Sequence, residues 1–89
     1  MRLDKFLQVS RIIKRRTVAA TLCQHGRVHV NGHKAKAGKT LVVGDILSIR
    51  IGEQEPSLYE VLKLPSGAVS KEKTLTLYQN ITAPPRAIV

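Results

Sequence analysis

The chain has 89 residues, a formal net charge of +9 and only three aromatic side chains. A chain of this length buries only about 60 to 65% of its unfolded surface, which is enough for one small core. The length therefore excludes a protein with several hydrophobic cores. The small number of aromatic residues predicts that the single core is aliphatic and made of Leu, Ile, Val and Ala.

The positive charge is concentrated in the first half of the chain. Residues 1–50 carry eleven Lys or Arg against two acidic residues, whereas residues 51–89 carry four of each kind. This asymmetry favours a polyanionic partner, and a basic face in a short chain is more typical of nucleic-acid binding than of membrane binding. No apolar run is long enough for a transmembrane helix or a signal-peptide core, so we expect a cytoplasmic protein without a membrane partner.

A first helix is predicted to begin near the N-terminus and to end near Ile13. Asp4 falls in its first turn, where a carboxylate suits the positive end of the helix dipole and could hold Arg2 or a neighbouring arginine in place. Apolar residues at i, i+3 and i+4 direct one stripe toward the core. These residues are Leu3, Phe6 and Leu7.

A second helix is predicted over residues 18–25, with Thr17 as its N-cap and Gly26 as its end. A helix this short does not persist alone in water, so it must pack against the first helix and the sheet. The positions expected to face the core are Val18 or Ala19, Leu22 and Cys23.

Residues 27–31 alternate between valines and polar side chains, as in a half-buried strand. Asn31-Gly32 then predicts a type I′ hairpin turn, which needs positive φ at both central residues. The returning segment, residues 33–37, is predicted to place Lys34 and Lys36 on one face.

The middle of the chain is predicted to supply further strands. A short apolar run at residues 41–43 is followed by a turn at Gly44-Asp45. Residues 46–51 and 58–64 read as antiparallel strands joined by an acidic loop.

The C-terminal part carries a weaker pattern. Residues 70–81 fit either a strand or a helix, and we favour a helix, followed by a frayed tail. We therefore predict an α+β fold, in which two N-terminal helices pack on a small bent antiparallel sheet. The predicted RNA-binding domain covers residues 1–66, and the predicted C-terminal extension covers residues 67–89.

Four cations at residues 11–16 stand without an acidic residue between them. A run of charges is often only a solvated helix end. Here further cations join it from both flanks, and a field of one sign costs stability unless a partner offsets it. We predict a phosphate-binding surface on which arginine forks make ordered contacts and lysines supply movable charges. The candidate RNA-binding residues are Arg2, Asp4, Lys5, Arg11, Lys14, Arg15, Arg16, Arg27, Asn31, Lys34 and Lys36.

The histidines and the single cysteine do not predict a metal site. Structural zinc sites need four ligands at characteristic spacings, whereas His29 is expected on a strand and His33 beyond a hairpin turn. His25 suits a helix C-terminus, and His29 and His33 are available to touch RNA. Cys23 cannot form an internal disulfide and is expected to be a small buried hydrophobe.

No catalytic constellation is evident. The acidic residues form no evident pair, no Ser or Cys has an evident base and orienting group, and a GxxxxGK phosphate loop is absent. We therefore expect a binding module with no enzymatic activity and no cofactor.

Several short motifs together resemble a known RNA-binding family. In order they are RLDKFL (residues 2–7), Arg11, Arg16-Thr17 before an alanine-containing helix, VHVNG (residues 28–32) and VGDIL (residues 43–47). They resemble the small RNA-binding domain of ribosomal small-subunit protein S-four. The resemblance implies two helices on a bent antiparallel sheet, with RNA bound along the helices and the adjoining hairpin.

Among stand-alone members of this family, the chain is most similar to RqcP-like proteins and to the fifteen-kilodalton heat-shock protein. RqcP-like proteins bind large ribosomal subunits that carry a stalled peptidyl-tRNA and, with RqcH, support addition of a C-terminal alanine tail. The resemblance implies that Arg2 and Arg16 contact ribosomal RNA or tRNA, with Asp4 organising them. The implied partners are large-subunit rRNA, tRNA, the large ribosomal subunit and an RqcH-like tailing factor, and we expect a monomer.

Two alternative functions stay open at this point. The chain could be a general rRNA-binding factor for ribosome assembly or recycling. It could also be a targeting subunit that acts in trans for an RNA-modifying enzyme.

Overall fold

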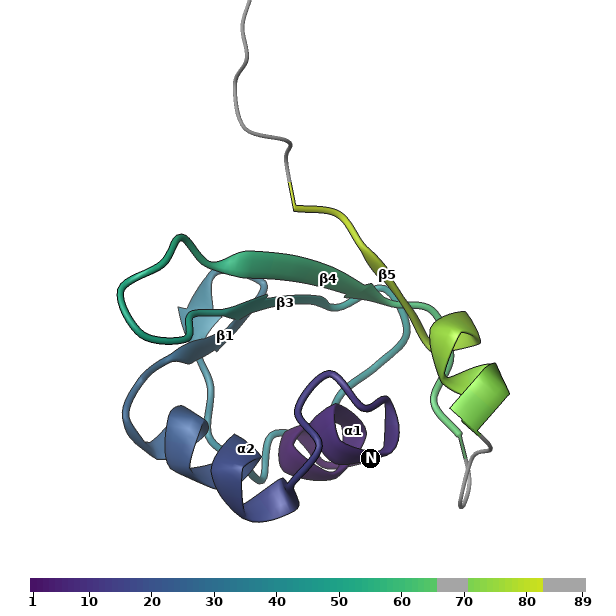
Figure 1. The fold of residues 1–89 in the computed structure, drawn as a ribbon, viewed down its shortest axis with the longest axis horizontal. Helices are drawn as coiled ribbons and strands as arrows, with labels where there is room; N and C mark the ends of the chain where they lie inside the picture. Colours follow the sequence, from purple (N-terminus) through teal and green to yellow (C-terminus); the bar gives the residue numbers. More distant parts are fainter. Residues whose placement is uncertain (66–70, 83–89) are drawn as a thin grey trace, which may run out of the picture.

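The structure is a computed structural model and describes residues 1–65 and 71–82. Two α-helices open the chain, and a five-stranded sheet with one 3-10 helix follows (Figure 1). The elements are α1 (Leu3–Val9), α2 (Arg16–Gln24), β1 (Val28–Val30), β2 (His33–Lys34), β3 (Ile46–Ile49), β4 (Ser57–Val61), η1 (Lys71–Thr76) and β5 (Tyr78–Asn80).

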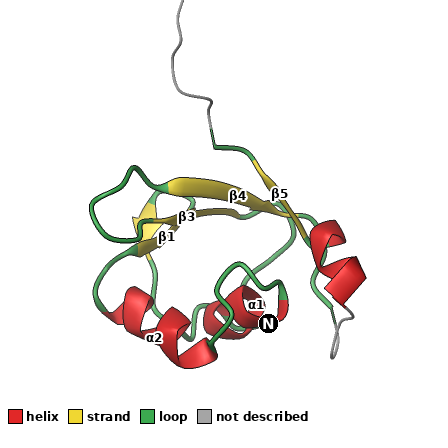
Figure 2. Ribbon diagram, in the orientation of Figure 1, coloured by secondary structure: helices red, strands yellow, loops and turns green. Residues whose placement is uncertain are grey.

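The helices and the sheet form two layers. The strands follow the order β2-β1-β3-β4-β5, and every neighbouring pair is antiparallel. Figure 2 shows α1 and α2 together on one face of the sheet, and no helix within the described residues covers the opposite face, which we call the outer face. The predicted α+β fold is confirmed. In the described residues, no helix is long and apolar enough to cross a membrane.

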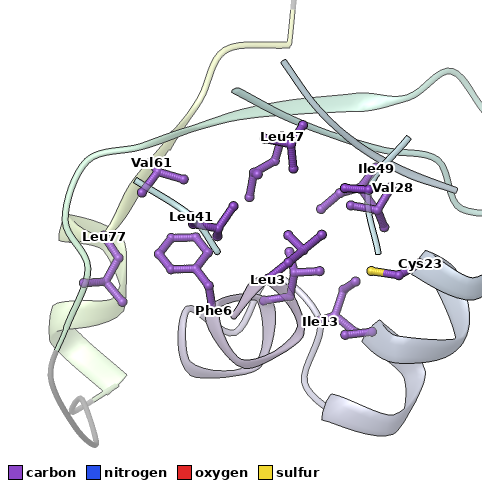
Figure 3. Packing of buried hydrophobic residues seen from close by; sticks show 14 residues of the cluster. Leu3, Phe6, Ile13, Cys23, Val28, Leu41, Leu47, Ile49, Val61 and Leu77 are labelled. Carbon is purple, nitrogen blue, oxygen red and sulfur yellow. The ribbon is translucent and has the colours of Figure 1, made fainter. Parts of the chain in front are cut away.

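The core lies between the two layers and is aliphatic apart from Phe6 and Cys23 (Figure 3). The residues predicted for the inner stripe of α1 are fully buried, and the two valines of β1 point into the same core. Alternation along β3 buries Leu47 and Ile49 in the same way. The largest fully buried hydrophobic side chains are Leu3, Phe6, Leu7, Val28, Leu41, Leu47 and Val61.

The hairpin between β1 and β2 has the expected turn. Both Asn31 (φ 52°) and Gly32 (φ 84°) adopt positive φ. The Asn31 amide also fixes the start of β3, because its Nδ2 donates to Asp45 Oδ1 at 2.9 Å and its Oδ1 accepts from the Ile46 N–H at 2.9 Å. The turn and the central strand are therefore locked together.

Both predicted helix boundaries need correction. Helix α1 ends at Val9 rather than near Ile13, and Arg11 takes a positive φ of 63° directly after it. The N-cap of α2 is Arg15, which makes no side-chain cap bond, so Thr17 is not the cap. Thr17 lies inside the helix, where its carbonyl accepts a hydrogen bond from Thr21 Oγ1 at 2.9 Å.

The inward face of α2 is largely as predicted. Ala19 and Cys23 are buried, Leu22 packs against the core, and Val18 is the exposed member of the predicted pair. His25 is the C-cap of α2, and Gly26 ends the helix with a φ of 72°. The predicted stop at Gly26 is therefore confirmed.

A helix over residues 70–81 is correct only for its first part. Helix η1 is followed by strand β5, which pairs with β4. Residues 78–80 form a strand and not a helix because they pair with the open edge of β4. Next to this pairing, the Leu62 N–H donates to the Leu77 carbonyl at 2.8 Å. Tyr78 also meets Tyr59 edge to face, with ring centroids 5.5 Å apart. The predicted tail at residues 83–89 lies outside the described residues.

Candidate nucleic-acid interface

Asp4 holds two arginines that are far apart in the sequence. Arg2 Nε donates to Asp4 Oδ1 at 3.2 Å, and Arg16 Nε donates to Asp4 Oδ2 at 3.2 Å. Arg16 Nη2 lies 3.5 Å from Oδ1. The expectation that Asp4 holds Arg2 or a neighbouring arginine in place is confirmed for Arg2. The contact with the distant Arg16 agrees with the organising role that the S-four resemblance implies for Asp4.

The backbone around Asp4 explains why its carboxylate is buried. The first turn of α1 runs beside residues 37–41, where the Leu3 N–H donates to the Lys39 carbonyl at 2.8 Å and the Asp4 N–H donates to the Ala37 carbonyl at 3.1 Å. Arg16 is the first residue of α2, so the same carboxylate joins the N-terminal ends of both helices. Asp4 is only 4% exposed as a result.

The charges around Asp4 decide its protonation state. Burial alone raises the pKa of this carboxyl. The hydrogen bonds from Arg16 and Arg2, together with their positive charges, outweigh burial and hold the Asp4 pKa below its ordinary value of 3.8. Asp4 is therefore an anion at neutral pH, and it keeps both arginines in fixed positions.

The outer ends of the two arginines remain available to a ligand. The Arg2 side chain is 57% exposed and the Arg16 side chain is 46% exposed, although each donates its Nε to Asp4. A guanidinium has five N–H donors in a planar fork that matches phosphate oxygens. Two forks fixed by one carboxylate therefore form a candidate anion-binding arrangement whose side-chain entropy is already restricted.

Lysines extend this arrangement along the segment after β2. Lys34 and Lys36 line a groove of about 530 Å³ against α2, and with Lys39 they also line an adjoining hollow of about 660 Å³. The turn between Lys36 and Lys39 lies beside Arg2, because a Cβ at Gly38 would be 3.7 Å from Arg2 Nη2. We call the set Arg2, Arg16, Lys34, Lys36 and Lys39 the helix-side surface.

Other predicted residues lie outside the helix-side surface. Lys5 is exposed on α1, and three cations are exposed around the connection between the two helices. Arg27 follows α2 and donates from Nη1 to the Gly52 carbonyl at 2.9 Å, near the acidic loop. The Asn31 amide is engaged inside the protein, which gives it a structural role. The three cations around the helix connection are Arg11, Lys14 and Arg15.

Two cations of interest are absent from the predicted site residues. Lys39 belongs to the N-terminal concentration of charge, but only the bond between its carbonyl and the Leu3 N–H shows that it lies beside α1. Arg50 ends the segment ILSIRI, and its N–H donates to the Arg27 carbonyl at 2.9 Å. The pairing of β1 with β3 brings Arg50 beside Arg27, and a single sequence indicates that strand pairing only weakly.

The described residues give little support for other kinds of site. Within residues 1–65 and 71–82, no group of three or more His, Cys, Asp or Glu side chains could hold a metal ion. Cys23 is buried, and burial followed by the negative charge of Asp4 raises the pKa of its thiol to about 11. A thiol with such a pKa is a poor nucleophile at neutral pH.

Comparison with known proteins identifies the class of this domain. Residues 1–47 match the family model described as the S4 domain, which covers more than half of the chain. The chain belongs to the S4 domain family. The match includes α1, α2, both strands of the hairpin and the first half of β3, so it contains the helix-side surface.

Sequence relatives and a solved structure indicate which kinds of S4-domain protein the chain is similar to. The chain is 49% identical over 79 residues to the RQC P-site tRNA stabilizing factor of Halalkalibacterium halodurans, covering 89% of this chain and 88% of that protein. It is 45% identical over 82 residues to the factor of the same name in Streptococcus pneumoniae, covering 92% and 91%. The trimeric structure of Vibrio cholerae heat shock protein 15 superposes with a TM-score of 0.80 and 29% identity, covering 90% of this chain and 80% of that one. The resemblance to both kinds of protein is confirmed.

Proposed function

We infer that this chain is a non-enzymatic RNA-binding factor that stabilises peptidyl-tRNA on a stalled large ribosomal subunit in the cytoplasm. The observation that carries the proposal is the pair of arginines fixed by Asp4 at 3.2 Å each. The names of the relatives support the choice of a P-site tRNA during ribosome-associated quality control. Contact with large-subunit rRNA and support of alanine tailing by an RqcH-like factor are parts of the same proposal.

The physical task of such a factor is to add binding energy without chemistry. Structured RNA is recognised mainly by shape, phosphates and 2′-hydroxyls, so donors on rigid elements are suitable. Arg2 and Arg16 lie at helix ends that the core fixes, whereas the lysines along the groove adjust to the backbone that they meet. The factor would thereby lower the free energy of the tRNA-bound subunit and slow tRNA release.

The test compares three RNA targets with purified protein: large subunits carrying peptidyl-tRNA, empty large subunits and precursor rRNA. We expect the tightest binding to the loaded subunits, together with increased alanine tailing when an RqcH-like factor is added. Equal binding to precursor rRNA would indicate an assembly factor instead. Co-purification with a modifying enzyme and no tailing effect would indicate a targeting subunit.

Variants connect this result to the geometry. Arg16→Gln is expected to weaken binding about tenfold or more, because a hydrogen bond to a charged group contributes about 1.5 to 3 kcal/mol. Lys63→Gln is the matched control, since Lys63 is exposed and its side chain makes no hydrogen bond or ion pair within the described residues. Equal effects of the two substitutions, with both proteins folded by circular dichroism, would contradict the proposed site.

A further inference from the structure

A second group of basic side chains lies where the outer face of the sheet meets the end of α2. Val28 and Ile49 point into the core, so the strand alternation directs their neighbours His29 and Ser48 outward. His29 and Ser48 are direct partners across β1 and β3. Arg27 and Arg50 extend the same two chains by one step and are joined by a backbone hydrogen bond.

These residues surround a hollow rather than a flat patch. It has a volume of about 420 Å³ and is bordered by the end of α2, the two central strands and the start of β4. The lining residues are His25, Gly26, Arg27, His29, Ser48, Arg50 and Pro56.

The donors in this hollow are largely unengaged by the protein. In residues 1–65 and 71–82, no hydrogen bond or ion pair uses the side chains of His25, His29 or Arg50, and Arg27 donates only through Nη1. A guanidinium and an imidazole both offer N–H donors to phosphate oxygens. Glu53 and Glu55 belong to the adjacent loop, but neither lines the hollow. A phosphate inside would therefore meet donors before it meets carboxylates.

We propose that His25, Arg27, His29 and Arg50 form a second RNA-backbone site on the outer face, and that it takes a different RNA segment from the helix-side surface. The proposal rests on the proposed function and deepens it. The anchoring arginine Arg16 and the hollow lie at opposite ends of α2, because Arg16 begins that helix and His25 is its C-cap. A duplex is stiff, so one laid along the helices does not also follow the outer face. The domain therefore joins two RNA segments, as a factor that holds a tRNA on an rRNA surface must do.

Affinity measurements test the second site separately from the first. The double variant His29→Gln with Arg50→Gln is expected to bind loaded large subunits about fivefold to thirtyfold more weakly, and the salt slope is expected to fall by about 0.7 to 0.9 for each phosphate that the variant no longer binds. Lys63→Gln removes one exposed positive charge elsewhere and should leave both quantities nearly unchanged. A double variant that behaves like Lys63→Gln overturns the second site, even if Arg16→Gln still weakens binding and the proposed function stands.

Tethered cleavage tests whether the two sites meet different RNA segments. Iron-EDTA is attached to a new cysteine at Thr17→Cys, beside Arg16, or at Glu55→Cys, beside the hollow. The native Cys23 is buried with a raised pKa and does not compete for the reagent. We expect the two probes to cut separate stretches of rRNA or tRNA in the loaded subunit. Cleavage of the same nucleotides by both probes, or none from the Glu55 position, would overturn the two-segment proposal.

Discussion

Asp4 and Arg16 are twelve residues apart in sequence, and their side chains meet at 3.2 Å where the two helices begin. This bond makes Asp4 an organiser of the candidate RNA site rather than an isolated acid in a basic field. A carboxylate normally repels phosphate, but here it lies beneath two exposed guanidinium groups. Its charge fixes their direction while they shield it from a ligand.

Asp4→Asn is therefore expected to weaken RNA binding although it makes the protein more positive. The uncharged amide no longer holds Arg2 and Arg16 firmly. Both side chains must then be ordered when RNA binds, and this loss of side-chain entropy lowers the affinity. We expect an affinity loss of about threefold to tenfold and a stability loss of only about 1 kcal/mol, because both arginines are about half exposed. Filter binding and urea unfolding measure the two effects.

A matched control for this substitution is Glu60→Gln on β4. It changes the net charge by the same amount, and the Gln79 Nε2 donor at 2.8 Å can still bond to the new amide oxygen. If Asp4→Asn and Glu60→Gln both strengthened RNA binding, net charge would dominate and the organising role would be wrong.

The depressed pKa of Asp4 predicts how stability depends on pH. The native carboxyl titrates below 3.8, so the native ion pairs contribute fully above the unfolded pKa, and this contribution is lost as the pH falls through the native pKa. The difference in unfolding free energy between the wild type and Asp4→Asn should be constant near neutral pH and shrink below about pH 4. Urea titrations across the acid range give this difference, and one that grew toward low pH would contradict the assignment.

Gly32→Ala should destabilise the protein through its backbone alone. Gly32 has a φ of 84°, and a Cβ added there would meet nothing within 4 Å, so no clash contributes. Left-handed backbone costs an L-residue about 1 to 2 kcal/mol, which corresponds to a Tm lower by roughly 4 to 16 °C for a domain of this size. Gly32→Val should be worse because its side chain is branched.

Gly38→Ala is the control for the turn. Its φ is outside the left-handed region, and the added Cβ would be in ordinary contact with Arg2 at 3.7 Å. Thermal unfolding should therefore give no loss of stability for this variant. Equal losses for the two alanine variants would mean that positive φ is not the cause.

Cys23 should resist modification while the protein is folded. Its side chain is buried, and its pKa is raised to about 11, so thiolate is scarce near pH 8. Alkylation by iodoacetamide, followed by mass spectrometry, should be at least about a hundredfold slower than in denaturant. Rapid alkylation of the native protein would show that α2 opens readily.

The sequence predicts the parts of the fold that depend on local chemistry. The buried stripe of α1, the alternating valines and the Asn31-Gly32 turn all arise from spacing or from a backbone preference that one or two residues carry. The place of Asp4 in the first turn of α1 predicts a contact with Arg2 or a neighbouring arginine, whereas its contact with the distant Arg16 is implied only by the family resemblance.

The differences from expectation arise where distant contacts decide the structure. Strand β5 forms because it pairs with the open edge of β4 and because Tyr78 packs edge to face against Tyr59. Neither contact can be predicted from residues 70–81 alone. The boundary between the two helices differs from the prediction because Arg11 takes a positive φ that its residue type does not favour. The hollow on the outer face likewise depends on the pairing of β1 with β3, which brings Arg50 beside Arg27.

The contact between α1 and residues 37–41 also has a consequence for the order of folding. Helices of seven and nine residues do not persist alone, so α1 and α2 gain stability only when this later segment and the sheet are present. A growing chain that has not yet reached Lys39 lacks the backbone partner of Leu3 and cannot bury Asp4 beneath its arginines. Such a chain attracts RNA only as a flexible polycation, and selective binding begins when the domain folds as one cooperative unit.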